Sequence, residues 1–429
     1  MFLGGAGLLG LASALPAAAA TDIEADRAWL QAILERYAGF GAKASGGAGD
    51  TASGAWLQGE LERFGYACRR QAFDVPCFDA ARATLTSGAD AVPVIPQAIV
   101  TPTGPQGLTA PLRLAAAGTD LSGAIALVDL PFKRWAALAD PQAAQPLADA
   151  FRRGAAAALL ITNGPTGEAI ALNVSTHRPG FGKQVAVLAP RDARPFLAAA
   201  AAGATATLTV DGQGGTRPAF NLIGRLDRGA ARDVIISTPR SGWFGCAAER
   251  GSGLAVWLYL VRWLAQARPN VNIEVLATSG HEYDYLGGEH YLAQAPRPDK
   301  VRLWTHIGAS AAARDWHELG ARLLPLPSAD SQRVLTASAD IVGPVRKAFR
   351  GLSGLEATYV ADPTTAGGEL VNVLNAGYGT LIGLYGGHRY FHTPDDDLRC
   401  VSADLVQPVA QAFQTALAGC LSVSAGSPA

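Results

Sequence analysis

The second half of the chain alternates short apolar segments with helix-patterned segments, and this alternation constrains the fold more than any other feature. The expected strands are 219–225, 234–238, 273–278, 301–307 and 380–384, and the expected helices are 252–266, 282–292 and 402–417. Such alternation is typical of a mainly parallel sheet with helices on both faces. We therefore expect a doubly wound α/β fold, in which ligands bind beyond the carboxyl ends of the strands.

The first half contains a segment, residues 78–217, whose pattern of expected strands and helices differs from that of the rest of the chain. Before it, helices at 22–37 and 55–64, a Gly/Ser-rich loop at 39–53 and a strand at 66–75 read as part of the larger fold. Within it we expect an Ala-rich helix ending near residue 153 and strands at 123–129, 154–163, 185–188 and 204–210. A chain of 429 residues, 49% of them hydrophobic, is long enough for two domains. We predict that residues 78–217 form a small α/β domain inserted into a catalytic domain of residues 21–77 and 218–429.

The N-terminal residues predict export. Residues 1–15 are apolar and small, and Pro16 is followed by four alanines that resemble a signal-peptidase cleavage site. We expect residues 1–20 to be a signal peptide and the mature chain to start near Thr21 in the periplasm or outside the cell. Residues 1–5 resemble the sequence that follows the paired arginines of a twin-arginine signal. The alternative is a short buried helix, and no other segment predicts an integral membrane span.

Charge and cysteine content exclude some classes of function. The formal net charge is −1, so no basic field is available to bind nucleic acid. The five cysteines include no C-x-x-C spacing, which argues against a thiolate zinc cluster. In an oxidising compartment Cys68 and Cys77 are candidates for a disulfide, and unpaired buried thiols are the alternative.

Three expected strand ends carry Gly-rich turns with polar side chains. Glu249 and Arg250 follow the strand at 234–238, His281 and Glu282 follow the next strand, and His392 follows the strand at 380–384. Carboxylates and imidazoles bind metals and transfer protons, and the carboxyl ends of parallel strands meet at one edge of the sheet. We therefore expect these side chains to converge on one site.

The order of these turns along the chain and their amino-acid sequences resemble those of the zinc aminopeptidases of the co-catalytic metal type. This group also contains glutaminyl cyclases and the transferrin receptor. The resemblance covers about residues 25–75 and 219–420, and its most specific pieces are residues 251–253, 282–288 and 391–395. The segment 78–217 resembles the protease-associated domain found in several exported peptidases.

The resemblance assigns a role to each matching residue. It implies that Glu249, Glu282 and His392 are metal ligands. The general base of the family falls on His281, and an asparagine of the family pattern falls on Arg250. The family's residues for a second metal correspond to Thr238, to Arg240 and to a position within residues 304–308 of this chain. None of these positions carries a carboxylate, although His306 lies near the last of them. The resemblance therefore implies one zinc ion rather than two.

These assignments predict an exported metal-dependent hydrolase or acyl transferase of the aminopeptidase type, acting on a peptide or small amide. His281 would move the proton, since an imidazole titrates near neutral pH. Two other functions remain open. One is a catalytically inactive binding protein on the same scaffold, and the other is an enzyme in which Arg240 and Arg250 bind an anionic substrate. Structural alternatives are a buried ion pair of Glu249 with Arg250 or Arg240, and a loop histidine at position 281.

Overall fold

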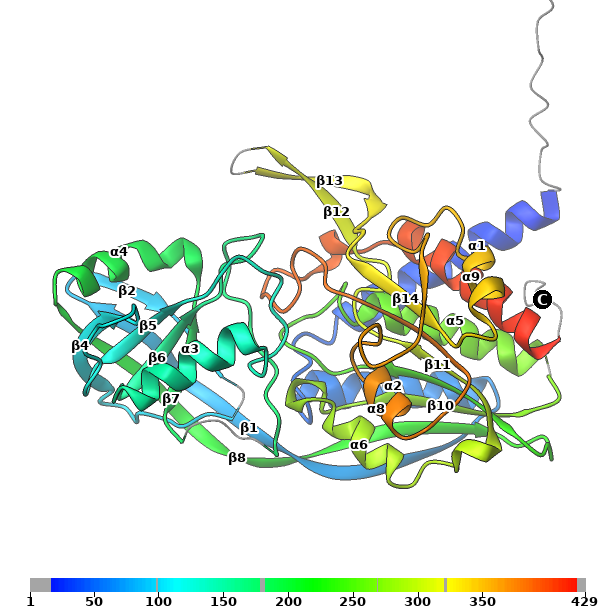
Figure 1. Ribbon diagram of the computed structural model, residues 1–429. Coiled ribbons are helices and arrows are strands. Elements are labelled where there is room, and N and C mark those ends of the chain that lie inside the picture. Colours follow the sequence, from blue (N-terminus) through cyan, green and yellow to red (C-terminus); the bar gives the residue numbers. More distant parts are fainter. Residues whose placement is uncertain (1–16, 98, 178–181, 268, 320–321, 423–429) are drawn as a thin grey trace, which may run out of the picture.

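The protein folds into a larger and a smaller lobe (Figure 1). The computed structural model describes residues 17–97, 99–177, 182–267, 269–319 and 322–422. Most of the predicted signal peptide, residues 1–16, lies outside the described residues. The helix α1, Ala17–Ala38, begins within the last part of that segment. Among the described helices none is long and apolar enough to cross a membrane.

A mostly parallel sheet forms the centre of the larger lobe, as predicted. The strands β9 (Asp233–Pro239), β10 (Asn272–Thr278), β11 (Val301–Ile307) and β16 (Leu381–Gly386) are parallel, in the order β16-β11-β9-β10. On one side β10 pairs antiparallel with β8, and on the other β16 pairs antiparallel with β14 (Arg333–Ala337), which is parallel to β15 (Thr358–Val360). All seven residues of β9 and of β10 are buried, which explains their continuous apolar sequences.

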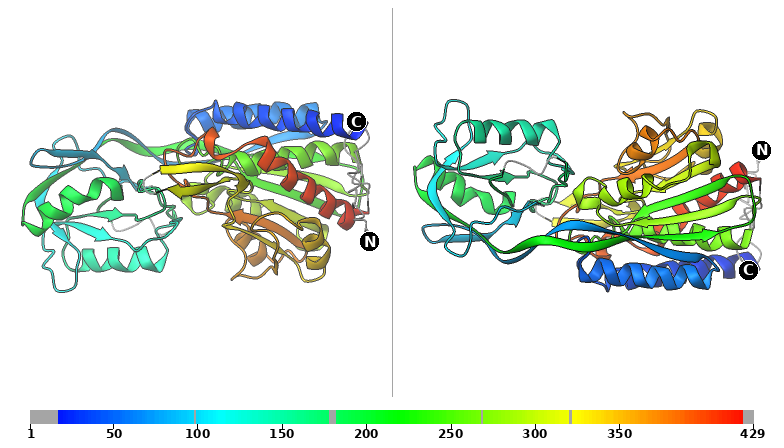
Figure 2. Two further views of the ribbon diagram at one scale, coloured as in Figure 1. Left: turned by 90° about the horizontal axis from the view of Figure 1, so that it is seen from above. Right: turned by 90° about the horizontal axis from the view of Figure 1, so that it is seen from below.

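Helices cover both faces of this sheet, which confirms the α/β fold class. One face is covered by α1, α2 (Ala48–Arg63), α5 (Gly251–Ala267), α7 (Val342–Ala348) and α9 (Ala403–Leu421), which share one apolar core. The other face is covered by α6 (Leu286–Leu292) and α8 (Leu370–Asn375). In both views of Figure 2 the blue helices α1 and α2 lie on the opposite side of the larger lobe from the orange segment that contains α8.

The smaller lobe is joined to the larger one by two long paired strands. The strands β1 (Ala67–Ser87) and β8 (Thr205–Leu226) are antiparallel neighbours over nearly their whole lengths and run from one lobe into the other (Figure 1). The predicted domain boundaries therefore fall inside continuous strands, at the level where Cys77 pairs with Gly215. Cys68 and Cys77 lie nine residues apart on this one strand. At about 3.3 Å per residue they are roughly 30 Å apart, so the disulfide expected as a possibility between them is wrong.

The smaller lobe has its own parallel sheet and helices. The strands β5 (Ile125–Asp129), β6 (Ala157–Ile161) and β7 (Gln184–Leu188) match the prediction, as does α3 (Pro141–Arg152). The elements not predicted are β2 (Asp90–Pro93), β3 (Ile95–Pro96), β4 (Leu108–Leu114) and α4 (Pro190–Ala201). These segments show no clear periodicity in the sequence, because they are short or, at β3, β4 and the start of α4, because they contain proline residues.

Several details of the larger lobe differ from the prediction, which also did not include β14, β15, α7 and α8. The helix expected at 282–292 is two elements, a 3₁₀ turn His281–Tyr283 and then α6, because Asp284 and Tyr285 have φ values of 51° and 70° that interrupt helical geometry. The loop expected at 39–53 is shorter, because α2 already begins at Ala48. A hairpin of β12 (Arg314–Leu319) and β13 (Arg322–Ala329) projects from this lobe and was not predicted (Figure 1).

Candidate functional site

A cavity of about 530 Å³ lies at the carboxyl ends of the central strands. His306 on β11 and Gly308 after it form part of the wall, and His281 and Tyr285 come from the turn after β10. Arg134, Ala136 and Asn173 of the smaller lobe complete the wall on another side. The cavity therefore lies where the α/β topology predicts a ligand site, and both lobes contribute to it.

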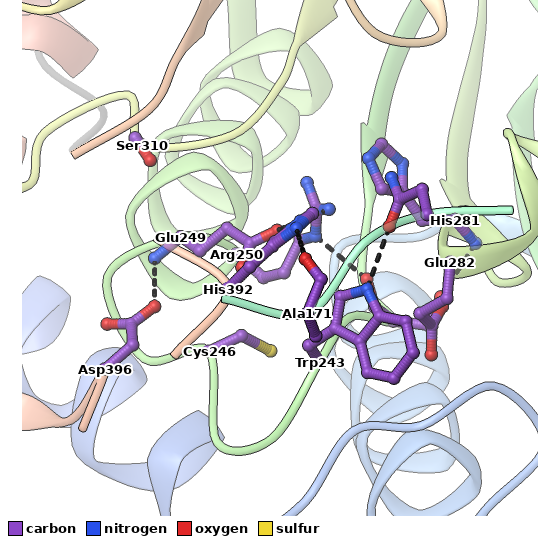
Figure 3. Close-up of polar contacts among 12 residues, drawn as sticks. Ala171, Trp243, Cys246, Glu249, Arg250, His281, Glu282, Ser310, His392 and Asp396 are labelled. Atoms are coloured by element: carbon purple, nitrogen blue, oxygen red, sulfur yellow. Dashed lines mark hydrogen bonds and ion pairs between the residues drawn. The ribbon is translucent and has the colours of Figure 1, made fainter. Parts of the chain in front are cut away.

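Beside this cavity, Glu249 forms a buried cluster with Arg250 and His392. Arg250 Nη2 lies 2.6 Å from Glu249 Oε1, and His392 Nε2 lies 3.2 Å from the same oxygen atom. All three side chains are fully buried. Burial opposes ionisation of Glu249, but the charges of Arg250 and His392 outweigh it and lower the pKa of Glu249 to about 2. Glu249 is thus a carboxylate that lies beside the Arg250 guanidinium and the His392 ring (Figure 3).

The hydrogen bonds of His392 indicate which partner its Nε2 atom can bind. Its Nδ1 atom is 2.9 Å from the carbonyl oxygen of Ala171, and because a carbonyl only accepts, Nδ1 carries a proton. In the neutral ring Nε2 would then present a lone pair to Glu249, which is itself an acceptor. The contact is favourable only when Nε2 is protonated or when both atoms face a cation. Arg250 supplies such a cation at the shared oxygen.

Glu282 does not join this cluster. Its carboxylate accepts hydrogen bonds from Ser45 N at 2.8 Å, from Ser45 Oγ at 2.6 Å and from Ser241 Oγ at 2.9 Å. Burial raises the pKa of Glu282, and the hydrogen bonds from Ser45 oppose that rise. The structure therefore brings together two of the three predicted metal ligands, Glu249 and His392, and directs the third toward residues near the start of α2.

Arg240 and Arg250 both have protein partners. Arg240 Nε lies 3.0 Å from Asp50 Oδ1, and its guanidinium carbon lies 4.4 Å from the centre of the Phe220 ring. Arg250 pairs with Glu249 and donates a hydrogen bond from Nε to the Ser241 carbonyl at 2.9 Å. Both side chains are fully buried, and neither belongs to the cavity wall. The buried ion pair of Glu249 with Arg250, considered as an alternative to metal binding, is therefore present.

His281 lies in the cavity wall beside a carboxyl group that the sequence did not indicate. Its Nδ1 atom is 3.5 Å from Glu369 Oε1, which also accepts a hydrogen bond from Thr278 Oγ1 at 2.7 Å. Burial, and then the charge of Arg250, lower the pKa of His281 well below its usual value. Burial raises the pKa of Glu369 to about 7. Near neutral pH, His281 is thus a neutral imidazole, and the neighbouring Glu369 carboxyl group gains or loses its proton close to that pH.

His306 is a second neutral imidazole in the cavity wall, and its hydrogen bonds indicate a different tautomer. Ser237 Oγ accepts a hydrogen bond from Trp304 Nε1 at 2.8 Å and lies 3.0 Å from His306 Nδ1. The simplest network has the Ser237 hydroxyl donating to Nδ1, which places the ring proton on Nε2. Burial and the charge of Arg250 lower the pKa of His306 to about 3. In this network His306 offers an N–H group rather than a lone pair on its Nε2 side.

The donor groups fit the expected zinc ion only in part. Glu249 and His392 provide a buried carboxylate oxygen and an imidazole nitrogen close together, as a zinc site requires. However, the Arg250 guanidinium already contacts that oxygen, and Glu282 is bonded elsewhere. Among the described residues, the set of three metal-binding side chains with ligand atoms all within 4.8 Å of one another is His388, Asp396 and Cys400. We therefore assign no chemical step to a metal.

Several residues of the site were missed from the sequence. Glu369 follows two glycines at the start of α8, and Asp50 lies in the first turn of α2. Ser45 lies in the loop before α2. The Gly367-Gly368-Glu369 sequence is the type of Gly-rich turn that marked the other three strand ends, but no predicted strand precedes it. Asp50 and Ser45 carry no signal beyond their residue type.

Comparison with solved structures identifies the fold. The chain resembles a zinc aminopeptidase from Bacillus subtilis, with 18% identity and a TM-score of 0.70 over 93% of this chain and 96% of that chain. It resembles a peptidase M28 precursor from Shewanella amazonensis, with 17% identity and a TM-score of 0.71 over 95% and 96% of the two chains. An aminopeptidase from Aneurinibacillus sp. strain AM-1 matches with 16% identity and a TM-score of 0.65 over 94% and 96%. The sequence has no match among protein-family models or curated proteins. The fold predicted from the turns is thus confirmed.

Proposed function

We propose that this chain is a hydrolase or acyl transferase that acts on an amide or peptide bond in the cavity between its lobes. The observation that carries the proposal is the pair of neutral imidazoles in the cavity wall, His281 and His306, whose neighbours favour opposite tautomers. One ring accepts a proton and the other donates a hydrogen bond. Amide cleavage needs both functions at one carbonyl group.

His281 is the proposed general base. Glu369 next to Nδ1 favours the tautomer with a proton on that atom, which leaves Nε2 as the acceptor. The separation of 3.5 Å is long for a hydrogen bond, and catalytic hydrogen bonds often shorten when substrate binds. The lowered pKa of His281 keeps the base free near neutral pH, and a carboxylate at Glu369 stabilises the imidazolium that forms during the reaction.

His306 is the proposed donor to the substrate oxygen. Its Nε2–H group would contact the carbonyl oxygen, on which negative charge grows when the carbon is attacked. Its lowered pKa keeps the ring neutral, and a neutral imidazole can still act as an electrophile of this kind.

The steps balance without a further reactant. A water molecule, or an amine in acyl transfer, attacks the carbonyl carbon and gives its proton to His281. The resulting tetrahedral oxyanion accepts a hydrogen bond from His306. The carbon–nitrogen bond then breaks, and the leaving amine takes the proton from His281.

Zinc dependence is the finer part of the proposal. The zinc in the name of the Bacillus subtilis neighbour supports it, and Glu249 and His392 are the residues that would hold one ion. A zinc ion would supply additional polarisation of a carbonyl group or of water. We further propose that the protein is exported, as its N-terminal sequence predicts, and that it acts on a peptide or small amide.

The test is turnover of a panel of aminoacyl anilides with and without added zinc, cobalt or manganese. We expect His281→Ala to lower kcat by about 10²–10⁴-fold, which is the usual effect of removing a general base. His177→Ala is the matched control, because that ring is exposed and contacts Glu289 away from the cavity. An unchanged rate in His281→Ala would contradict the base assignment, and Glu282→Ala then shows whether any activity depends on the predicted ligand.

A non-catalytic binding protein is the second candidate. It is favoured by the Arg250 guanidinium, which contacts the carboxylate that the resemblance assigns to a metal. An anion site formed by Arg240 and Arg250 gains no such support, since neither borders the cavity. Absence of turnover on every amide with each metal, together with saturable binding of a peptide, would select this second candidate.

A further inference from the structure

Three buried side chains with metal-binding atoms meet on the segment between β16 and α9. They are His388, Asp396 and Cys400, and their ligand atoms all lie within 4.8 Å of one another. None of the three belongs to the ligand set implied by the sequence or to the wall of the cavity. Their side chains are almost completely shielded from solvent.

One distance in this cluster, between His388 and Asp396, is that of two metal ligands rather than of a hydrogen bond. His388 Nε2 lies 3.4 Å from Asp396 Oδ1. An N–H···O hydrogen bond is usually about 2.9–3.0 Å long. Two ligands at about 2.0–2.1 Å from a zinc ion in tetrahedral geometry are separated by roughly 3.3 Å. The observed distance therefore matches an edge of a zinc tetrahedron.

His388 also has a free atom and an orienting partner. Its Nε2 atom is buried and has no hydrogen-bond partner. Its Nδ1 atom lies 2.9 Å from Ser310 Oγ, and the same oxygen accepts a hydrogen bond from the His388 backbone N–H at 3.4 Å. A hydroxyl oxygen has two acceptor lone pairs, so Ser310 can accept the ring proton as well, and metal binding selects that tautomer because it leaves a lone pair on Nε2. A hydrogen bond on the far nitrogen is the usual arrangement for a histidine that binds a metal.

We propose that His388, Asp396 and Cys400 bind one zinc ion. On binding, Cys400 loses its thiol proton to solvent, and the thiolate and the Asp396 carboxylate together balance the charge of the ion. The three protein ligands leave the fourth tetrahedral position to a water molecule. This site is separate from Glu249 and His392, and it does not depend on the proposed amide chemistry.

The ion would fix the geometry of the neighbouring site. Asp396 accepts hydrogen bonds from Ala248 N at 2.8 Å and from Glu249 N at 2.9 Å, and Figure 3 shows Asp396 directly beside the backbone of Glu249. His392 lies between His388 and Asp396 in the sequence. A metal bound by these two residues and Cys400 would hold both His392 and Glu249 in place, which is a structural function.

The experiment is metal analysis of the full chain after zinc loading and dialysis. We expect about one zinc per wild-type chain and at least a tenfold loss of affinity in Cys400→Ser and in His388→Gln, since each removes a ligand. Cys420→Ser is the matched control, because that half-buried thiol lies in α9 outside the cluster. Circular dichroism checks the fold of every variant.

Cobalt substitution makes the test independent of variant folding. Wild-type protein loaded with Co²⁺ should show the thiolate-to-metal charge-transfer absorption that only a cysteine ligand produces, and His392→Ala should retain it. Zinc retention that survives Cys400→Ser but is lost in His392→Ala would overturn the proposal and place the ion at Glu249. Failure of wild-type protein to retain zinc or to show this absorption would also overturn it.

Discussion

Arg250 Nη2 lies 2.6 Å from Glu249 Oε1, and neither side chain is exposed to solvent. The two residues are adjacent in the chain, in the turn just before α5, so the backbone itself holds the two charges together. Breaking a buried ion pair by removing one partner costs far more than the pair contributes when intact, because the remaining charge is left without compensation. The pair therefore makes the stability of this site sensitive to either residue.

We predict that Arg250→Met lowers the free energy of unfolding by about 3–5 kcal/mol, as measured by urea denaturation. Methionine keeps much of the side-chain volume, so the loss reports the uncompensated charge of Glu249. The double variant with Glu249→Gln should recover part of the loss. Arg297→Met is the control, because its ion pair with Asp299 is exposed, and it should cost less than about 1 kcal/mol. Equal losses in the two single variants would contradict this account.

The central strands were predicted accurately because they are buried on both faces. The expected strands 234–238, 273–278 and 301–307 agree with β9, β10 and β11 to within one residue at each end. A continuous apolar run has little alternative to a buried strand in such a fold. The linking strands β1 and β8 were underestimated, because where they leave both lobes their side chains are exposed and their sequence is mixed.

The contact between Glu249 and His392 agrees with the strand-end argument, whereas the contacts of the other predicted side chains do not follow from it. The strand-end argument placed His281, Glu249 and His392 near one another, since parallel strands end at one edge. The direction of the Glu282 side chain depends on Ser45, which is 237 residues away in the sequence, and no local pattern encodes that contact. Glu369 was missed for the same reason, because its contact with His281 exists only after α8 packs beside α6.

We predict that His306→Phe lowers kcat on an amide substrate by about 10²–10³-fold with little change in KM, which is the usual effect of losing one donor to an oxyanion. Phenylalanine fills the space of the ring but offers no N–H group. His290→Phe is the control, since that ring stacks on Phe73 outside the cavity wall. If His306→Phe changed only stability and left kcat intact, His306 would be a packing residue.

We predict that Ser237→Ala has a smaller effect of the same kind. Without the Ser237 hydroxyl, nothing fixes the proton of His306 on Nε2, and part of the population would present a lone pair to the substrate. Steady-state kinetics should show a reduced kcat, and the pH profile should keep its shape because the general base is unaltered. Ser237→Thr retains the hydroxyl and should restore the rate. Loss of activity in both variants alike would point to a packing effect.

Glu369 should make stability depend on pH in a defined direction. Burial raises its pKa from 4.5 to about 7, so the folded state keeps a proton that the unfolded chain has already lost. Stability therefore falls as pH rises through this window. The loss of stability is absent below the pKa that Glu369 has in the unfolded chain, and it is complete above the pKa that Glu369 has in the folded protein. Glu369→Gln removes the titrating group. The free energy of unfolding of the variant should therefore rise relative to that of the wild type by about 3 kcal/mol as the pH increases through this window. Denaturation at a series of pH values measures this.

Arg134 of the smaller lobe links the two lobes at the cavity. Arg134 Nη1 donates to Asp330 Oδ2 at 2.8 Å and to the Gly387 carbonyl at 2.6 Å, and it forms part of the cavity wall. Arg134→Met removes both bonds, and hydrogen bonds to charged groups contribute about 1.5–3 kcal/mol each. We therefore expect KM to rise by about 10-fold or more, with a smaller change in kcat, because the wall opens while His281 and His306 stay in place.

The control for this prediction is Arg152→Met, which removes an exposed arginine of the same lobe that pairs with Asp149. It should leave KM unchanged, since that ion pair lies outside the cavity wall. Asp330→Asn tests the same contact from the larger lobe and should raise KM in the same direction as Arg134→Met. The double variant should then be less than additive, because both changes remove one shared contact. Independent, additive effects on KM would mean that Arg134 acts on the substrate directly rather than by holding the two lobes together.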